Sequence, residues 1–405
     1  MRTYEKYKDS GISWIGKVPE NWVKCRFKNI MNLITDASTS DNKIGLENIE
    51  SGTGKYIQTD SKFEGNGVAF KPHDIVYGKL RPYLQKVWCA DSEGNAVGDF
   101  FVFRNKCNSS SFFLKYVLLS DNFTQFANGT TYGAKMPRVS SNAILYQETY
   151  IPPLSEQEAI ANYLDKKTAE IDKIIAEREK KIELLNELKS SIISRAVTKG
   201  INPHAKMKDS GIDWIGEIPE DWVKCRFKNI MNLITDTSTS DNKIGLENIE
   251  SGTGKYVQTD SKFEGNGVAF KPHDILYGKL RPYLQKVWCA DSEGNAIGDF
   301  FVFRTKCNSS SSFLKYVLLS DNFTQFVNGT TYGAKMPRVS SNTILDQEYY
   351  IPSLPEQQAI ANYLDKKTEE IDKTISAIKN ECNLYKEYKQ SLISEVVTGK
   401  RKVID

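Results

Sequence analysis

This sequence contains an internal repeat with a period of 200 residues, which restricts the folds that the chain can adopt. Adding 200 to a residue number in the first half gives its counterpart in the second, and residues 8–173 differ from residues 208–373 at 18 of 166 positions. Solenoid repeats have periods of about 20–50 residues, so a period of this length indicates a duplicated domain. We therefore expect two copies of one fold, each large enough to bury its own core.

The first part of each repeat has the pattern of a mixed domain. Residues 1–152 and 201–352 contain short strand-like runs separated by turn signals such as SGTGK and SEGN, with one helix expected at 109–129. We predict that each part is a globular α+β domain around a curved, mainly antiparallel sheet.

The second part of each repeat, residues 153–200 and 353–405, predicts a long helix. In the first copy Ser155 is a candidate N-cap, and no Pro or Gly follows it before about Thr198. Apolar side chains recur at heptad spacing, which favours a two-helix coiled coil. These positions are Leu164, Ile171, Ile175, Ile182, Leu185, Ile192 and Ala196, and in the second copy Leu364, Ile371, Ile375, Ile378, Cys382, Tyr385, Leu392 and Val396. About 43 helical residues span about 65 Å, so such helices are spacers.

Neither helix can bury its apolar stripe alone, so we expect the two helices to pack against each other. An antiparallel pair is favoured, because a parallel pair would need a crossover and the sequence contains no long linker. An antiparallel coiled coil would relate the repeats by a pseudo-two-fold axis. Duplex DNA has local two-fold axes, so two identical readers in this arrangement suit inverted half-sites.

The composition is that of an ordinary globular protein. Hydrophobic residues make up 40% and charged residues 26%, and the net charge is +3, so any nucleic-acid-binding surface must be local. No run approaches the roughly 18–20 apolar residues of a membrane span, and the polar N-terminus does not resemble a signal peptide. We expect a cytoplasmic location without membrane contact.

The cysteines indicate reduced thiols in a reducing compartment. None of the seven forms a C-x-x-C pair, and the sequence contains only three histidines, so no zinc site is expected. The cysteines are Cys25, Cys89, Cys107, Cys225, Cys289, Cys307 and Cys382.

Catalytic motifs are missing from the sequence. The segment SGTGKY resembles part of a phosphate-binding loop, but Ile49 stands where the first glycine belongs and Tyr56 replaces Ser or Thr. His73 and Asp74 lie near a lysine, as in some nucleases, but the second carboxylate of a metal site is missing. We predict a chain that is not an enzyme and has no catalytic residue, metal or cofactor of its own. A nuclease that uses His73 and Asp74 is the enzymatic alternative.

Two motifs resemble those of a known family. KxSGIxWIGxxPxxW occurs at 8–22 and 208–222, and IPPLSEQEAIANYLDKKTAEID at 151–172 is repeated as IPSLPEQQAIANYLDKKTEEID at 351–372. Together they are similar to the specificity subunits of type I restriction-modification systems, over essentially the whole chain. The resemblance implies two target-recognition domains that each read half of a bipartite DNA sequence. It also implies that the helices act as a ruler.

The resemblance further implies partners. They are double-stranded DNA and two modification (adenine methyltransferase) subunits, and S-adenosylmethionine, ATP and Mg would be used by partner subunits. Whether a restriction/translocase subunit joins is left open. Family members usually carry two dissimilar recognition domains, whereas these two are nearly identical, which predicts half-sites that are reverse complements. A coiled-coil scaffold whose domains bind proteins or glycans is the non-DNA alternative.

The candidate DNA contacts are cationic and polar side chains in two loops of each repeat. YGKLRPYLQK at 77–86 interleaves cations with tyrosines, and NGTTYGAKMPRVSS at 128–141 is shaped by Gly and Pro. Loops similar to the second face DNA in the family. The predicted contacts are Lys79, Arg81, Tyr83, Lys86, Thr131, Tyr132, Lys135 and Arg138, repeated as Lys279, Arg281, Tyr283, Lys286, Thr331, Tyr332, Lys335 and Arg338.

The first candidate loop also has a less specific interpretation. A solvated strand edge with core tyrosines is the alternative for 77–86. A third segment pair, 35–43 with 51–56, is more consistent with ordinary turn chemistry.

Overall fold

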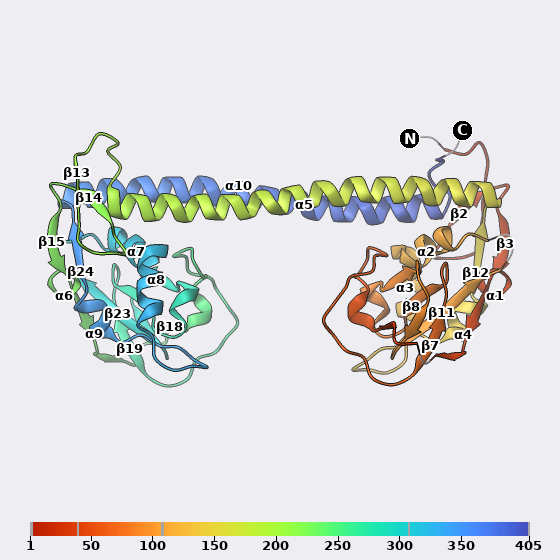
Figure 1. Cartoon of the computed structure of the whole chain (residues 1–405), viewed down its shortest axis with the longest axis horizontal. Coiled ribbons are helices and arrows are strands. Elements are labelled where there is room, and N and C mark those ends of the chain that lie inside the picture. Colours follow the sequence, from red (N-terminus) through yellow and green to blue (C-terminus); the bar gives the residue numbers. More distant parts are fainter. Residues whose placement is uncertain (1–2, 39, 107–108, 307, 404–405) are drawn as a thin grey trace. The chain divides into compact units, whose positions relative to one another are not determined.

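The computed structural model describes residues 3–38, 40–106, 109–306 and 308–403. It divides into two compact units, Met1–Glu179 with Lys379–Asp405 and Lys180–Ile378. Each unit combines an α+β domain with one segment of each long helix (Figure 1). The predicted fold class, two domains with mainly antiparallel sheets and two long helices that pack together, is confirmed. The boundaries predicted at residues 152, 200 and 352 stay predictions.

The elements of the two repeats correspond one to one. The first repeat contains β1 (Tyr7–Asp9), β2 (Lys17–Pro19), β3 (Val23–Arg26), α1 (Phe27–Ile30), β4 (Met31–Ile34), β5 (Ala37–Ser38), β6 (Lys43–Ile44), η1 (Leu46–Asn48), β7 (Gly67–Phe70), β8 (Ile75–Gly78), η2 (Pro82–Leu84), β9 (Val87–Cys89), β10 (Gly94–Ala96), β11 (Phe100–Asn105), α2 (Ser111–Leu119), α3 (Asp121–Gly129), α4 (Ser141–Tyr146), β12 (Glu148–Ile151) and α5 (Leu154–Lys199). The second repeat contains β13 (Met207–Asp209), β14 (Glu217–Pro219), β15 (Val223–Arg226), α6 (Phe227–Ile230), β16 (Met231–Ile234), β17 (Thr237–Ser238), β18 (Lys243–Ile244), η3 (Leu246–Asn248), β19 (Gly267–Phe270), β20 (Ile275–Gly278), η4 (Pro282–Leu284), β21 (Val287–Cys289), β22 (Gly294–Ala296), β23 (Phe300–Thr305), α7 (Ser311–Leu319), α8 (Asp321–Gly329), α9 (Ser341–Leu345), β24 (Glu348–Ile351) and α10 (Leu354–Val397).

Each domain is built around a four-stranded antiparallel sheet that is buried on both faces. In the first unit its strand order is β4-β11-β8-β9. Along β8, Ile75 and Tyr77 belong to the larger core and Val76 to a smaller one, as the period-two alternation of a strand requires. The smaller core also takes residues from a second sheet of order β5-β7-β10-β6, in which β6 and β10 pair in parallel. Burial on both faces explains why β8 and the first four residues of β11 carry no charged side chain.

The opening motif at 8–22 closes one end of the larger core. Its Ile12, Ile15 and Trp22 side chains are buried there. Trp22 Nε1 donates to Glu156 Oε1 (3.3 Å), in the first turn of α5. The motif therefore joins the domain to the long helix.

The single helix expected at 109–129 is in fact two helices, α2 and α3. Ser120 separates them with an extended backbone (φ −67°, ψ 145°). Its hydroxyl donates to Val117 O (2.7 Å) and accepts from Phe123 N (3.3 Å), which ends one helix and caps the next. The prediction was wrong because the apolar spacing continues across the break, so the periodicity hides it.

Replacing Ser120 with alanine is expected to lower the free energy of unfolding by about 1–2 kcal/mol, because the α3 N-cap is lost. Ser320 makes the same two bonds in the second unit, so Ser320→Ala should have the same effect. Urea denaturation measures both. The matched control is Ser92→Ala at an exposed bend, which should change stability by less than about 0.5 kcal/mol. Equal losses at Ser120 and Ser92 would contradict the capping role.

Within each unit the two long helices are antiparallel. In the first unit Asp172 of α5 contacts Lys389 of α10, and Arg178, further along α5, contacts Glu381, which comes earlier in α10. Most of the predicted heptad side chains are buried, although Ile182, Leu185, Ile192 and Tyr385 are only partly so. The helix α5 begins at Leu154, one residue before the predicted cap, so Ser155 lies in its first turn. The first i→i+4 bond runs from Gln157 N to Pro153 O.

The three polar residues that interrupt the first heptad pattern all have polar partners. Lys189 pairs with Asp372 (2.7 Å), and Arg178 pairs with Glu381 (3.1 Å). The Thr168 hydroxyl lies 3.3 Å from the Tyr116 hydroxyl of α2. The interruptions are therefore the points at which the helices make polar contacts with each other and with the domain.

Helix α2 contacts α5 and so connects the domain to the long helix (Figure 1). The Tyr116 hydroxyl donates to Asp165 Oδ1 (2.6 Å), and Lys115 Nζ lies 3.0 Å from the same oxygen. Burial is the main cause that raises the pKa of Tyr116 well above its usual range, and the hydrogen bond to Asp165 adds to the shift.

No helix in the described part of the chain is both long enough and apolar enough to span a lipid bilayer.

The described cysteines are free thiols. They are Cys25, Cys89, Cys225, Cys289 and Cys382. Cys107 and Cys307, which the prediction of reduced thiols also covers, lie outside the described residues.

Candidate nucleic-acid interface

The structure brings the two predicted loops of each unit together into one surface. The first loop runs from β8 through η2, and the second joins α3 to α4. Arg81 N donates to Pro137 O (2.7 Å), Val139 N donates to Lys79 O (3.1 Å), and Leu80 forms a bridge with Arg138. The equivalent bonds of the second unit run from Arg281 N to Pro337 O (2.7 Å) and from Val339 N to Lys279 O (3.1 Å). Residues 77–86 with 128–141, and 277–286 with 328–341, are called the loop surfaces below.

The second loop is a closed turn that points polar and apolar side chains outward. Tyr132 and Arg138 exchange two backbone hydrogen bonds (2.9 and 3.0 Å), and Gly133 adopts a positive φ of 88°. The loop displays Tyr132 (59% exposed), Lys135 and Met136. The Thr131 hydroxyl donates to Asn128 O in the last turn of α3 (2.9 Å).

Two of the predicted cations share one carboxylate. Arg138 donates from Nε (3.0 Å) and Nη2 (2.8 Å) to the two oxygens of Asp99, and Lys79 Nζ lies 3.8 Å from Asp99 Oδ1. The Arg138 hydrogen bonds hold the pKa of Asp99 below its ordinary value, so the carboxylate stays charged. Asp299 forms the equivalent ion pairs with Arg338 (3.0 Å) and Lys279 (3.9 Å). These charges fix the two loops to each other.

The Lys86 side chain forms hydrogen bonds within the domain. Its ammonium donates to Leu46 O and Ile49 O, both at 2.7 Å, and Lys286 does the same with Leu246 O (2.8 Å) and Ile249 O (2.7 Å). Burial lowers the pKa of Lys86. A phosphate contact by Lys86 would have to replace both bonds, so this predicted contact has the least geometric support.

The short helix η2 holds its flanking residues in a disfavoured conformation. Arg81 (φ 51°) and Gln85 (φ 49°) are both left-handed, and so are Arg281 and Gln285. The Gln85 side chain donates to Asp121 Oδ1 (2.9 Å) and Thr124 Oγ1 (3.0 Å), which anchors one end of the turn to α3. Tyr83 at its centre is 53% exposed.

Residues 51–56, part of the third candidate segment pair, contact the long helices. Lys55 Nζ contacts Asp172 Oδ2 of α5 at 2.6 Å, and Gly52 O accepts from Gln390 Nε2 of α10 (3.1 Å). This part of the segment therefore holds the helices. Thr39, which belongs to the same candidate, lies outside the described residues.

The geometry does not favour a nuclease centred on His73 and Asp74. Asp74 is buried, and its two oxygens accept from Arg104 Nε (2.8 Å) and Nη2 (2.6 Å). The His73 ring packs edge-on against Phe112. In the described ranges, no group of three or more His, Cys, Asp or Glu side chains could hold a metal ion.

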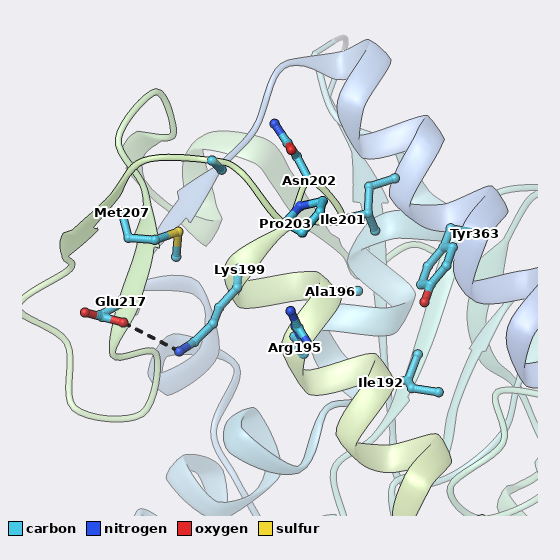
Figure 2. Close-up of a pocket in the computed structure, with 12 residues that line it drawn as sticks. Ile192, Arg195, Ala196, Lys199, Ile201, Asn202, Pro203, Met207, Glu217 and Tyr363 are labelled. Carbon is cyan, nitrogen blue, oxygen red and sulfur yellow. Dashed lines mark ion pairs between the residues drawn. The ribbon is translucent and has the colours of Figure 1, made fainter.

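Figure 2 shows a pocket of about 500 Å³ in the second unit, where α5 ends. Arg195, Lys199 and Tyr363 line it, and Lys199 forms an ion pair with Glu217 (3.7 Å). The pocket shares no residue with the loop surface of this unit, so it is not part of the candidate interface.

Sequence reasoning missed Asp99, Asp299 and the exposed methionines Met136 and Met336. Asp99 lies 39 residues from Arg138, and nothing in the local pattern GDFF marks it as the partner. Met136 could have been noticed, because an apolar residue in a Gly- and Pro-shaped loop has no core to enter.

The fold is similar to that of chains from type I restriction-modification systems, and curated relatives are named as specificity subunits of such systems. No protein-family model matches the chain. Two curated relatives are the "Type I restriction enzyme MjaVIII specificity subunit" of Methanocaldococcus jannaschii (24% identical, 96% of this chain and 94% of the relative) and the "Type I restriction enzyme EcoDI specificity subunit" of Escherichia coli (22%, 95% and 89%).

Solved structures share the fold. One is a chain from a study of the "complex assembly and conformational transition of the type I R-M system" (TM-score 0.73, 15% identical, 94% of this chain and 98% of that chain). Another is the HsdS subunit from Thermoanaerobacter tengcongensis (TM-score 0.55, 16% identical, 95% and 98%). The resemblance predicted from the two motifs is confirmed over nearly the whole chain.

Proposed function

We propose that this chain is the DNA-sequence-specificity subunit of a type I restriction-modification complex. The observation that carries the proposal is the identity of the two loop surfaces, since none of the 18 differences between the repeats falls in 77–86 or 128–141. Each surface exposes Arg, Lys and Tyr side chains that suit phosphate and base contacts. Two identical surfaces on one fold should read the same half-site twice.

We further propose that the two half-sites are reverse complements. The antiparallel packing of α5 against α10, seen in each unit by itself, supports an inverted relation between the readers. A protein with such symmetry matches the two-fold axes of duplex DNA. The predicted contacts that the geometry supports best are Arg81, Tyr83, Tyr132 and Lys135, with their counterparts Arg281, Tyr283, Tyr332 and Lys335.

The proposed partners are duplex DNA and two modification (adenine methyltransferase) subunits, which would use S-adenosylmethionine. A restriction/translocase subunit would use ATP and Mg. The chain itself contributes recognition, and the chemistry belongs to the partners. Exposed apolar side chains on the helices, Leu384 and Tyr388 in the first unit and Leu184 and Leu188 in the second, support docking of protein partners there.

Mapping methylated adenines across the genome of a host that expresses this chain with its modification subunit tests the proposal. We expect one interrupted motif whose halves are reverse complements. Unrelated halves would contradict the symmetric reading, and a direct repeat would contradict the inverted one. If no motif appears, and the purified chain shows no salt-sensitive affinity for duplex DNA, a protein- or glycan-binding scaffold replaces the proposal.

A further inference from the structure

The cations of each loop surface differ in how far they are already paired. Arg138 and Lys79 are bound to Asp99, and Lys86 is bound to two carbonyl oxygens. Arg81 and Lys135 are exposed, and among the described residues none forms a hydrogen bond or an ion pair with either of these two side chains. Within the described part of the chain, this surface therefore offers two unpaired cations for a ligand, Arg81 and Lys135.

Arg81 is held more rigidly than Lys135. Its backbone N–H donates to Pro137 O (2.7 Å), and Leu84 N donates back to Arg81 O (2.9 Å). Pro82 follows it and restricts its backbone further. The base of the Arg81 side chain is thus fixed by both loops, whereas Lys135 lies at the tip of one loop.

The backbone of Arg81 gives no reason for an arginine at this position. A φ of 51° is a conformation that glycine adopts without steric cost and that other residues rarely adopt. Disfavoured backbone conformations cluster at binding and catalytic sites, where the surrounding structure holds them. The function of the side chain must therefore account for the arginine.

We infer that Arg81 and Arg281 each read one guanine in the major groove, one in each half-site. This inference rests on the proposed function. An unpaired guanidinium on a backbone that is held in place presents parallel donors that match the O6 and N7 acceptors of guanine, a pairing that lysine cannot reproduce. Lys135, exposed at the tip of its loop, serves as a phosphate contact. Arg138 is a positioning residue, because its guanidinium is bound to Asp99 and holds the loop.

The test is selection from random duplexes by the complex of the full chain with its modification subunits. The wild-type protein should select a G·C pair at one fixed position of each half-site. The double variant Arg81→Lys with Arg281→Lys should lose about ten- to a hundredfold of the discrimination at that position and keep the others. Arg81→Lys alone should relax one half-site only.

The matched control is Lys135→Ala with Lys335→Ala. It should weaken binding to all sequences alike and make the affinity less dependent on salt, while every base preference is kept. A second variant, Arg81→Gly with Arg281→Gly, relieves the disfavoured backbone. It should denature at the same or a higher urea concentration than the wild-type protein and still lose the guanine preference.

If the wild-type complex selects no motif, the proposed function itself fails. If a motif is selected but the Arg81 and Arg281 variants keep every base preference, only the guanine inference is overturned. If the lysine control loses the same base preference as the arginine variants, the division of roles between Arg81 and Lys135 is overturned.

Discussion

Replacing Asp172 and Asp372 with asparagine is expected to lower the free energy of unfolding by about 3 kcal/mol at each site. In the first unit Asp172 lies between two lysines, Lys389 of α10 (2.7 Å) and Lys55 of the domain (2.6 Å). The Lys389 side chain is only 8% exposed, so asparagine would leave a buried ammonium without its counter-charge. The second unit repeats the arrangement with Lys189 and Lys255 around Asp372.

Urea denaturation of each single variant measures this effect. The matched control is Glu179→Gln, which removes a partner of Lys386 (3.5 Å) on the same helix pair. Both side chains of that pair are 57% exposed, so a change below about 1 kcal/mol is expected. Similar losses for Asp172→Asn and Glu179→Gln would contradict the idea that burial of the lysine sets the effect.

The same site predicts a pH dependence. Burial by itself raises the pKa of Asp172, but the hydrogen bonds from Lys389 and Lys55 outweigh it and hold the pKa below its ordinary value. The stability that Asp172 contributes is therefore present at neutral pH and is lost as the pH falls through the lowered pKa of the folded state. The difference in stability between the wild-type protein and Asp172→Asn should shrink on acidification. A difference that stays constant down to strongly acidic pH would contradict the pairing.

A duplex that carries the half-site twice as an inverted repeat should bind about a hundredfold more tightly than one that carries it twice as a direct repeat. When both readers engage one duplex, the second binding step becomes intramolecular, and this typically gains 10²–10⁴ in affinity. A direct repeat allows only one reader to bind in the correct orientation, so it should bind like a single half-site.

Titration of the proposed complex of this chain and its modification subunits with labelled duplexes of equal length and composition measures this ratio. The half-site and gap come from the methylation map. The salt concentration is held constant, because affinities for DNA depend strongly on it. A single half-site duplex serves as the control and should match the direct repeat. Equal affinity for the inverted and direct repeats would contradict the inverted arrangement, even if the chain reads DNA.

Local patterns in the sequence predicted much of the fold. The 200-residue period predicted two equivalent domains, and heptad spacing predicted the helices that the structure shows at Leu154–Lys199 and Leu354–Val397. The break at Ser120 was missed, because apolar periodicity runs through it and a serine inside a helix looks the same in sequence as a serine between two helices. The parallel pairing of β6 with β10 was not anticipated either, because it joins strands about 50 residues apart.

The sequence also located the candidate surface but could not rank its residues. The amino-acid sequence does not distinguish the cations of this surface, which are Lys79, Arg81, Lys86 and Arg138. They differ only in what lies beside them, and those neighbours come from other parts of the chain, such as Asp99 for Arg138. Which charge is free for a ligand is therefore a property of the folded domain.

The duplication, the mixed domain and the long helices could all be predicted from the amino-acid sequence. The duplication follows from direct comparison of residues 200 positions apart, and strand alternation and heptad spacing are local signals. Folding sets which loops meet and which lysines are buried against Asp172 and Asp372. It also leaves Arg81, in a left-handed backbone, without a side-chain partner among the described residues. The physical reason is that charge pairing and burial depend on distances of a few ångströms between residues far apart in the chain. Such distances exist only once the two loops and the two helices have packed.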